Sequence, residues 1–169
     1  PSPVKARRSM RPRKLSAARR LHRWPSVVWT GITTWSPGTA SLLSKMLSGK
    51  DIRESGSGNA GATNMLRTYG KKMGVITLLL DVLKGIVVIL LSRLVKNIAG
   101  IDEIYPVISY IAGVCVILGH NFPLYFGFKG GKGVATSLGV VLMLDWKVGL
   151  IVAVVAIAVM AVTRYVSLG

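Results

Sequence analysis

Acidic residues are scarce in this sequence of 169 residues, where six Asp and Glu stand against 22 Lys and Arg and the formal net charge is +16. Two histidines and one cysteine leave no basis for a disulfide or a metal-ligand set. Cys115 lies in an apolar run and is interpreted as a buried bystander. Outside the first 24 residues no basic stripe with interleaved aromatics is present, which argues against nucleic-acid binding.

Three familiar catalytic motifs are also missing. The glycines of residues 56–61 spell GxGxxG, but no Val/Ile-rich strand precedes them, so a dinucleotide site is not predicted. The segment GFKGGKG resembles a P-loop, yet Lys132 is followed by Gly133 instead of Ser or Thr, and the usual magnesium ligand is absent. Neither histidine is followed five positions later by Asp, which argues against acyltransferases that use such a His–Asp pair.

Apolar sequence, in contrast, is abundant: hydrophobic residues make up 51% and the mean hydropathy is +0.52. Four apolar runs predict four membrane-spanning helices, because about 20 helical residues cross a ~30 Å hydrocarbon core. The sequence therefore predicts an all-α polytopic membrane protein. The predicted spans are Gly74–Val95, Ile104–Gly119, Val134–Leu144 and Val148–Thr163.

Basic residues between the spans predict their orientation. Among the loops that flank the spans, the segment 45–73 carries the most Lys and Arg, which predicts that it is cytoplasmic. Alternation then puts residues 120–133 and 164–169 on the same side, provided that 134–144 is a true crossing. We therefore expect three polar segments to share one membrane face.

The first 40 residues differ from the rest. Nine of the 22 basic residues precede Pro25, and this stretch contains no acid. Such an arm could bind lipid headgroups or RNA, or act as a transit peptide. We interpret residues 1–40 as an irregular segment that a mis-assigned start or a frame change substituted for an apolar helix, and residues 41–169 as the membrane domain.

Two charges interrupt the first span. Asp81 and Lys84 lie three residues apart and share a helix face. A charge at mid-membrane costs about 2.5–3.5 kcal/mol on insertion scales, so an unpaired placement toward lipid is disfavoured. Either the two form an internal ion pair that fixes helix packing, or Lys84 reaches toward a phosphate.

Two glycine-rich cationic segments are the candidate anion sites, because glycines let backbone N–H groups approach an anion. In the first, hydroxyls, amides and an arginine could converge on a phosphate; they are Ser57, Asn59, Gly61, Thr63, Asn64 and Arg67. In the second, a glycine loop and a lysine precede a helix N-terminus, which favours anions; the residues are Gly130, Gly131, Lys132, Gly133 and Thr136. His120 and Asn121 end a span as either a satisfied polar pair or catalytic groups. The glycines could also merely permit tight turns.

The segments SGNAGATNMLRTYGKK, DVLKG, GHNFPLYFGFKGGKGVATSLG and TRYVSLG resemble, in this order, the PlsY-type acyl-phosphate:glycerol-3-phosphate acyltransferases of bacteria. The resemblance covers residues 41–169. It implies an inner-membrane enzyme of seven helices, about four of them present here, that needs no cofactor. The reaction implied is acyl transfer from acyl phosphate to the 1-hydroxyl of glycerol 3-phosphate, giving lysophosphatidate and phosphate.

By the same resemblance, four residues contact the phosphorylated substrates: Ser57, Arg67, Lys132 and Ser167. The loop 130–133 holds the phosphate of acyl phosphate. Acyl phosphate is already activated, so the site has to position two anions and stabilise charge without a strong protein nucleophile.

Two departures lead us to expect that this exact polypeptide is poorly folded or inactive. The family's first helix is replaced, and the sequence ends within the third motif. Asp81 and the polar groups of the motifs are then expected to lack burial and partners. Two alternatives stay open: a small transporter with phosphate-selecting loops, and a non-catalytic membrane scaffold.

Overall fold

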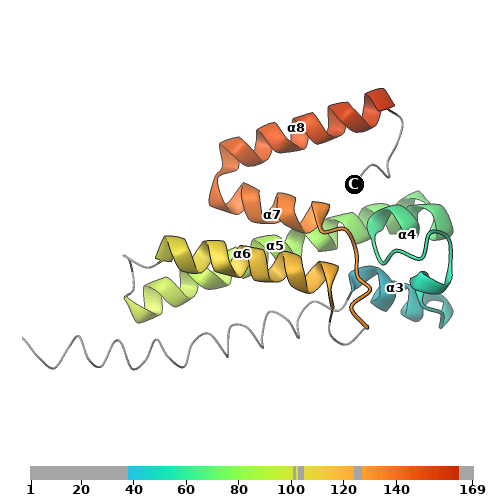
Figure 1. The fold of residues 1–169 in the computed structure, drawn as a ribbon, viewed down its shortest axis with the longest axis horizontal. Coiled ribbons are helices and arrows are strands. Elements are labelled where there is room, and N and C mark those ends of the chain that lie inside the picture. The colour runs from blue at the N-terminus through green and yellow to red at the C-terminus, as the bar shows by residue number, and fades with distance from the viewer. Residues whose placement is uncertain (1–37, 101, 103–104, 124–126, 164–169) are drawn as a thin grey trace, which may run out of the picture.

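The computed structural model describes residues 38–100, 102, 105–123 and 127–163. Within these ranges the regular elements are all helices and no strand is present, which confirms the predicted all-α fold class. Figure 1 shows the six α-helices and one short 3-10 helix. They are α3 (Thr39–Ser48), η1 (Ile52–Glu54), α4 (Ala62–Tyr69), α5 (Lys71–Ala99), α6 (Tyr105–Asn121), α7 (Val134–Leu144) and α8 (Trp146–Thr163).

Each predicted apolar span corresponds to one helix. α7 has the predicted bounds, whereas α5 extends beyond the predicted span at both ends and stops where Gly100 takes a left-handed conformation. With 29 residues, α5 is the one described helix that is both long and apolar enough to cross a membrane. α6, α7 and α8 are apolar but shorter.

The chain reverses direction at each step from α5 to α8 (Figure 1). The segment between α3 and α4 and the segment before α7 consequently lie at the same end of the molecule. At the other end, Arg93 of α5 donates hydrogen bonds to the Tyr105 hydroxyl of α6 and to the Met143 carbonyl near the end of α7. α7 therefore carries the chain away from the glycine-rich end, but its 11 residues are too few to cross a bilayer by themselves.

Glycines allow α5 and α7 to pack with their backbones in close contact. A Cβ on Gly85 would lie 2.5 Å from the Thr136 carbonyl oxygen, and one on Gly139 would lie 2.1 Å from the Val82 carbonyl oxygen. Small residues at a crossing bring helices within reach of many van der Waals contacts, which is the main source of helix association in membranes. This crossing sets the position of α7 and of the loop before it.

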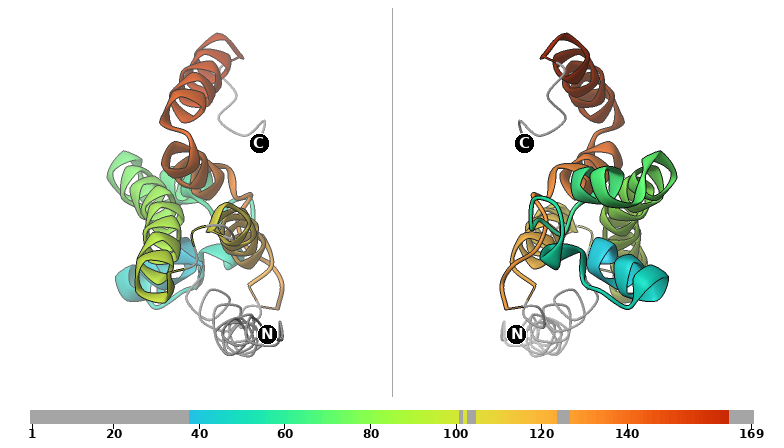
Figure 2. Two further views of the ribbon diagram at one scale, coloured as in Figure 1. Left: turned by 90° about the vertical axis from the view of Figure 1, so that its left-hand side faces the viewer. Right: turned by 90° about the vertical axis from the view of Figure 1, so that its right-hand side faces the viewer.

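The outer surface of the bundle is apolar. α8 packs mainly against α7 and projects from the remaining helices (Figure 2). Its large side chains are exposed, including Ile151 and Val154 at 64% each. A water-soluble monomer rarely exposes so large an apolar area, whereas a lipid-facing helix does.

The expected division after residue 40 falls inside α3. α3 begins at Thr39, and Ala40 is fully buried in a cluster with Ile52, Ala60 and Met65, so Thr39 and Ala40 belong with the helices that follow. The expectation for residues 1–37 lies outside the described residues.

Candidate functional site

The two glycine-rich segments meet at one end of the bundle. A Cβ built on Gly131 would lie 3.1 Å from the Ala60 carbonyl oxygen, so the backbones of the two segments are in direct contact. A second link is the hydrogen bond from Arg53 Nη1 to the Lys129 carbonyl oxygen, at 3.5 Å. Segments separated by about 70 residues thus lie against each other at one end of the bundle, and together they are the candidate site.

Asn64 organises the first segment from within. Its buried amide nitrogen donates to the carbonyl oxygens of Ile52, Ser55 and Asn59, and its side-chain oxygen accepts from the Ser57 N–H at 3.0 Å. Both ends of the amide are therefore engaged with the loop backbone. Asn64 shapes the loop and does not face an anion, which differs from the convergence expected from the sequence.

Gly56 makes this arrangement possible. Its φ of +59° lies in the left-handed region, and a Cβ there would lie 2.2 Å from Asn64 Oδ1. The glycine spacing that imitates a dinucleotide motif thus serves the packing of the loop around Asn64.

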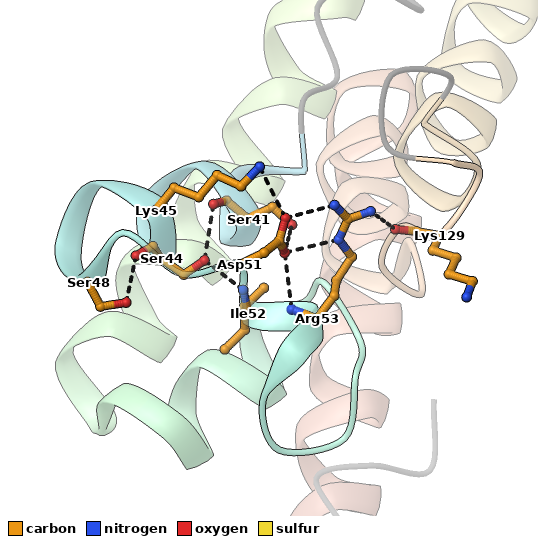
Figure 3. Close-up of polar contacts among 8 residues, drawn as sticks. All are labelled: Ser41, Ser44, Lys45, Ser48, Asp51, Ile52, Arg53 and Lys129. Atoms are coloured by element: carbon orange, nitrogen blue, oxygen red, sulfur yellow. Dashed lines mark hydrogen bonds and ion pairs between the residues drawn. The ribbon is translucent and has the colours of Figure 1, made fainter.

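Asp51 organises the turn at η1, just before the first segment, and Figure 3 shows the side chains around it. Its buried carboxylate accepts hydrogen bonds from the Ser41 hydroxyl and from Arg53, and forms ion pairs with Arg53 at 2.7 Å and Lys45 at 3.4 Å. These contacts tie α3 to η1. Because Arg53 also reaches the Lys129 carbonyl, the carboxylate indirectly fixes the second segment as well.

Both members of the Asp51–Arg53 pair are charged at neutral pH. The hydrogen bond from the Arg53 guanidinium holds the pKa of the Asp51 carboxyl well below its usual range, although burial opposes the shift. The same hydrogen bond raises the pKa of Arg53. An open depression of about 390 Å³ lies beside this pair, lined by Asp51, Arg53, Glu54, Gly58 and Lys129.

The second segment folds back onto the end of α6. The Gly131 N–H donates to the His120 carbonyl and the Gly130 N–H to the Asn121 carbonyl, each at 3.1 Å. No side chain fits there: a Cβ on Gly130 would lie 2.0 Å from the His120 carbonyl oxygen. These two amides are engaged in the loop, so they differ from the free anion donors that the glycine pattern suggested.

Gly133 ends the loop and begins α7. Its φ of +76° is left-handed, and a Cβ would lie 2.5 Å from Asn121 Oδ1. The first turn of α7 follows directly, with Thr136 fully buried. The N–H groups of such a first turn have no partner inside the helix, and they favour a negative charge.

Three buried side-chain oxygens in this region have no hydrogen-bond partner among the described residues: Asn59 Oδ1, Asn121 Oδ1 and Thr136 Oγ1. Buried polar atoms are normally paired with protein groups or with ordered water, so each of the three has the capacity for one further hydrogen bond. All three belong to predicted site residues.

The cationic and hydroxyl side chains predicted to contact substrate are accessible. Ser57, Arg67 and Lys132 are exposed, and Thr63 and Gly61 are half-buried at the start of α4. Ser167 lies outside the described residues. Among the described residues no three His, Cys, Asp or Glu side chains lie close enough to hold a metal ion.

The charges within the first span form an internal cluster. Asp81 is 2% exposed and its carboxylate lies 2.8 Å from Lys84 Nζ. Thr39 donates a hydrogen bond to the same carboxylate, and Lys84 Nζ contacts His120 Nδ1. The expectation that Asp81 lacks burial and partners is therefore wrong, because α3 and α6 cover it from both sides.

Thr39, Asp51 and Arg53 were missed by sequence reasoning. A signal existed for Asp51, which is one of two acids in a strongly basic segment and stands two residues before an arginine. No local signal existed for Thr39, since its partner Asp81 is 42 residues away.

The fold and the site together define a helical membrane protein whose two glycine-rich polar segments form one site at the end of the bundle. Residues 36–169 match the family model described as glycerol-3-phosphate acyltransferase. The chain belongs to the glycerol-3-phosphate acyltransferase family.

Curated relatives carry the same description. The chain is 49% identical over 131 residues to the glycerol-3-phosphate acyltransferase of Clostridioides difficile, covering 78% of this chain and 63% of that protein. It is 46% identical over 144 residues to the glycerol-3-phosphate acyltransferase of Shouchella clausii, and the match covers 85% of this chain and 68% of that protein. The chain therefore spans less than two thirds of the Clostridioides relative.

Two solved structures have the same fold. PlsY, an integral membrane glycerol 3-phosphate acyltransferase in its glycerol 3-phosphate form, is 39% identical with a TM-score of 0.64, covering 83% of this chain and 69% of that one. The lysophosphatidic acid form is 35% identical with a TM-score of 0.58, and the match covers 78% of this chain and 64% of that one. These relatives confirm the predicted family and the membrane location.

Proposed function

We propose that this chain transfers a fatty acyl group from acyl phosphate to the 1-hydroxyl of glycerol 3-phosphate, giving lysophosphatidate and inorganic phosphate. This replaces the expectation of an inactive polypeptide, because Asp81 is buried and paired in spite of the two departures. The solved relative's glycerol 3-phosphate and lysophosphatidic acid forms support this acceptor and this product. The observation that carries the proposal is the contact between the Ala60 and Gly131 backbones, because a reaction between two anions requires both binding segments in one site.

Lys132 and Arg67 have the central electrostatic roles in this proposal. Both are exposed at the glycine-rich end, and their charges offset the repulsion between the two phosphates. Since the Gly130 and Gly131 amides are engaged, the phosphate of acyl phosphate is held by Lys132 and by the N–H groups at the start of α7. Ser57 and Ser167 complete the phosphate contacts.

The chemistry needs no protein nucleophile. The 1-hydroxyl oxygen of glycerol 3-phosphate attacks the carbonyl carbon of acyl phosphate, and the bond from that carbon to the phosphate oxygen breaks. The hydroxyl proton passes to an oxygen of the departing phosphate. The protein positions the two anions and stabilises the negative charge that develops on the carbonyl oxygen.

We further propose that the site faces the cytosol of a bacterial inner membrane. From residue 41 onward, the segment 45–73 carries six Lys and Arg, more than any other segment outside the spans, and Lys/Arg-rich segments stay cytoplasmic. Modification of a single cysteine at Ser57 by a membrane-impermeant reagent in intact cells, but not in inside-out vesicles, contradicts this orientation.

The test of activity uses membranes containing the chain, supplied with glycerol 3-phosphate and acyl phosphate. Lysophosphatidate and released phosphate are measured for the parent, Lys132→Ala and Lys147→Ala. Lys147 is the matched control, because it is also exposed but lies at the start of α8, just beyond the far end of α7. We expect Lys132→Ala to lower kcat/KM by about 100-fold, the usual effect of removing one transition-state donor, and Lys147→Ala to be unchanged.

Three results contradict the proposal. They are an inactive parent, equal losses in both variants, and transport of glycerol 3-phosphate into vesicles without acyl transfer.

A further inference from the structure

A continuous line of polar contacts connects α3 to the second glycine-rich loop through the interior of the bundle. Thr39 donates to the Asp81 carboxylate, which pairs with Lys84 at 2.8 Å. Lys84 Nζ contacts Nδ1 of His120, whose side chain is 3% exposed. The line therefore joins α3, α5 and α6 and ends beside the loop.

The direction of the hydrogen bonds follows from the groups involved. A lysine ammonium has three hydrogens and no acceptor, so Nδ1 of His120 has to accept from Lys84. The ring proton then lies on Nε2, which is the atom that faces Gly131. Lys84 thereby fixes both the tautomer and the orientation of the imidazole.

His120 holds the loop with two different groups. Its carbonyl oxygen accepts from the Gly131 N–H at 3.1 Å, and its ring lies so close to Gly131 that a Cβ there would be 2.1 Å from Nε2. Gly131 precedes Lys132 directly in the chain. A change in the ring position therefore moves the backbone of Lys132.

We infer that His120, held by the Asp81–Lys84 pair, is a positioning residue that fixes the glycine loop and with it the Lys132 side chain. The inference rests on the proposed function for its kinetic consequence, but not for the geometry of the loop. An ion pair that served only helix packing would not require the imidazole to lie against the loop.

A matched pair of variants separates these two roles. Asp81→Asn combined with Lys84→Met, and Asp81→Asn combined with Lys84→Gln, both remove the two charges and keep side chains of similar length. Only Gln can donate to Nδ1 of His120. If the cluster merely fills the helix interface, the two variants behave alike.

We expect the Met variant to lose on the order of tenfold in kcat/KM for acyl phosphate relative to the Gln variant, with the KM for glycerol 3-phosphate less affected. In detergent, trypsin is expected to cut the Met variant faster after Lys129 and Lys132. Cutting after Lys147, at the far end of α7, serves as the control.

The inference is overturned if the Met and Gln variants have equal kcat/KM and are cut at equal rates. It is also overturned if cutting after Lys147 is accelerated in the Met variant as much as cutting after Lys129 and Lys132. His120→Asn is the second variant, because it keeps an acceptor near Nδ1 but removes the ring from Gly131. It should accelerate cleavage after Lys129, and unchanged cleavage contradicts the inference. An inactive parent contradicts the proposed function alone, because the cleavage experiment needs no turnover.

Discussion

Replacing Gly131 with alanine is the most direct perturbation of the composite site. The new Cβ would lie 2.1 Å from His120 Nε2 and 3.1 Å from the Ala60 carbonyl oxygen, whereas ordinary contact begins at 3.4 Å. The imidazole cannot retreat, since it is 3% exposed and contacts Lys84 on its other nitrogen. The loop has to move instead.

The required displacement is about 1 Å, and a misplacement of that size costs about 100-fold in rate, equivalent to about 2.7 kcal/mol in activation free energy. Overpacking of this kind also lowers the free energy of unfolding by about 1–3 kcal/mol. Because Lys132 follows Gly131, we expect the loss to fall mainly on the use of acyl phosphate.

The assay measures kcat/KM for acyl phosphate in membranes that contain the parent, Gly131→Ala or Gly38→Ala. Gly38 is the matched control, because a Cβ there meets its nearest neighbour at an ordinary 3.6 Å. Folding is followed through Cys115, the single cysteine of the sequence, which is 7% exposed and reacts with a thiol dye when the bundle opens. Equal kcat/KM values for Gly131→Ala and Gly38→Ala would refute the steric reasoning.

Three further predictions concern stability. Gly139→Ala should lower the thermal midpoint by an amount equivalent to about 1–3 kcal/mol, since its Cβ would lie 2.1 Å from a carbonyl of α5; an unchanged midpoint in the thiol-dye assay contradicts the close crossing. Asn64→Leu leaves the three carbonyl oxygens that Asn64 binds without a donor, at a cost of about 1–3 kcal/mol each in the free energy of unfolding. Trypsin should then cut faster after Arg53, and an unchanged rate of cutting there argues against the role of Asn64. Because the pKa of Asp51 is lower in the folded than in the unfolded chain, its stabilising contribution is full above about pH 4 and is lost as the pH falls toward the folded pKa. The difference in midpoint between the parent and Asp51→Asn should therefore be constant at neutral pH and shrink below about pH 4.

Local patterns were sufficient for the four apolar helices α5 to α8, whereas α3 and α4 were not predicted. An apolar run in lipid is stable as a helix, and α7 was predicted with its observed bounds because Gly133 precedes the run and Asp145 follows it. The location of both glycine-rich segments at one end also followed from the sequence, because each helix reverses the chain.

The roles of individual polar residues did not follow from local pattern. Asn64 and Lys132 both lie in glycine-rich segments, yet Asn64 is buried against three carbonyls and Lys132 is exposed. Glycine spacing does not distinguish a loop that presents its amides from one that bonds them to the preceding helix. That distinction depends on where the end of α6 lies.

The sequence by itself determined the fold class, the family, the four apolar helices and the two glycine-rich candidate segments, because these depend on composition and on motifs within short stretches. Only the tertiary structure decided that Asp81, Lys84 and His120 form one buried line behind Gly131, and that Arg53 links Asp51 to Lys129. These contacts join residues far apart in the chain, so they depend on how closely the glycines of α5 and α7 let the helices approach.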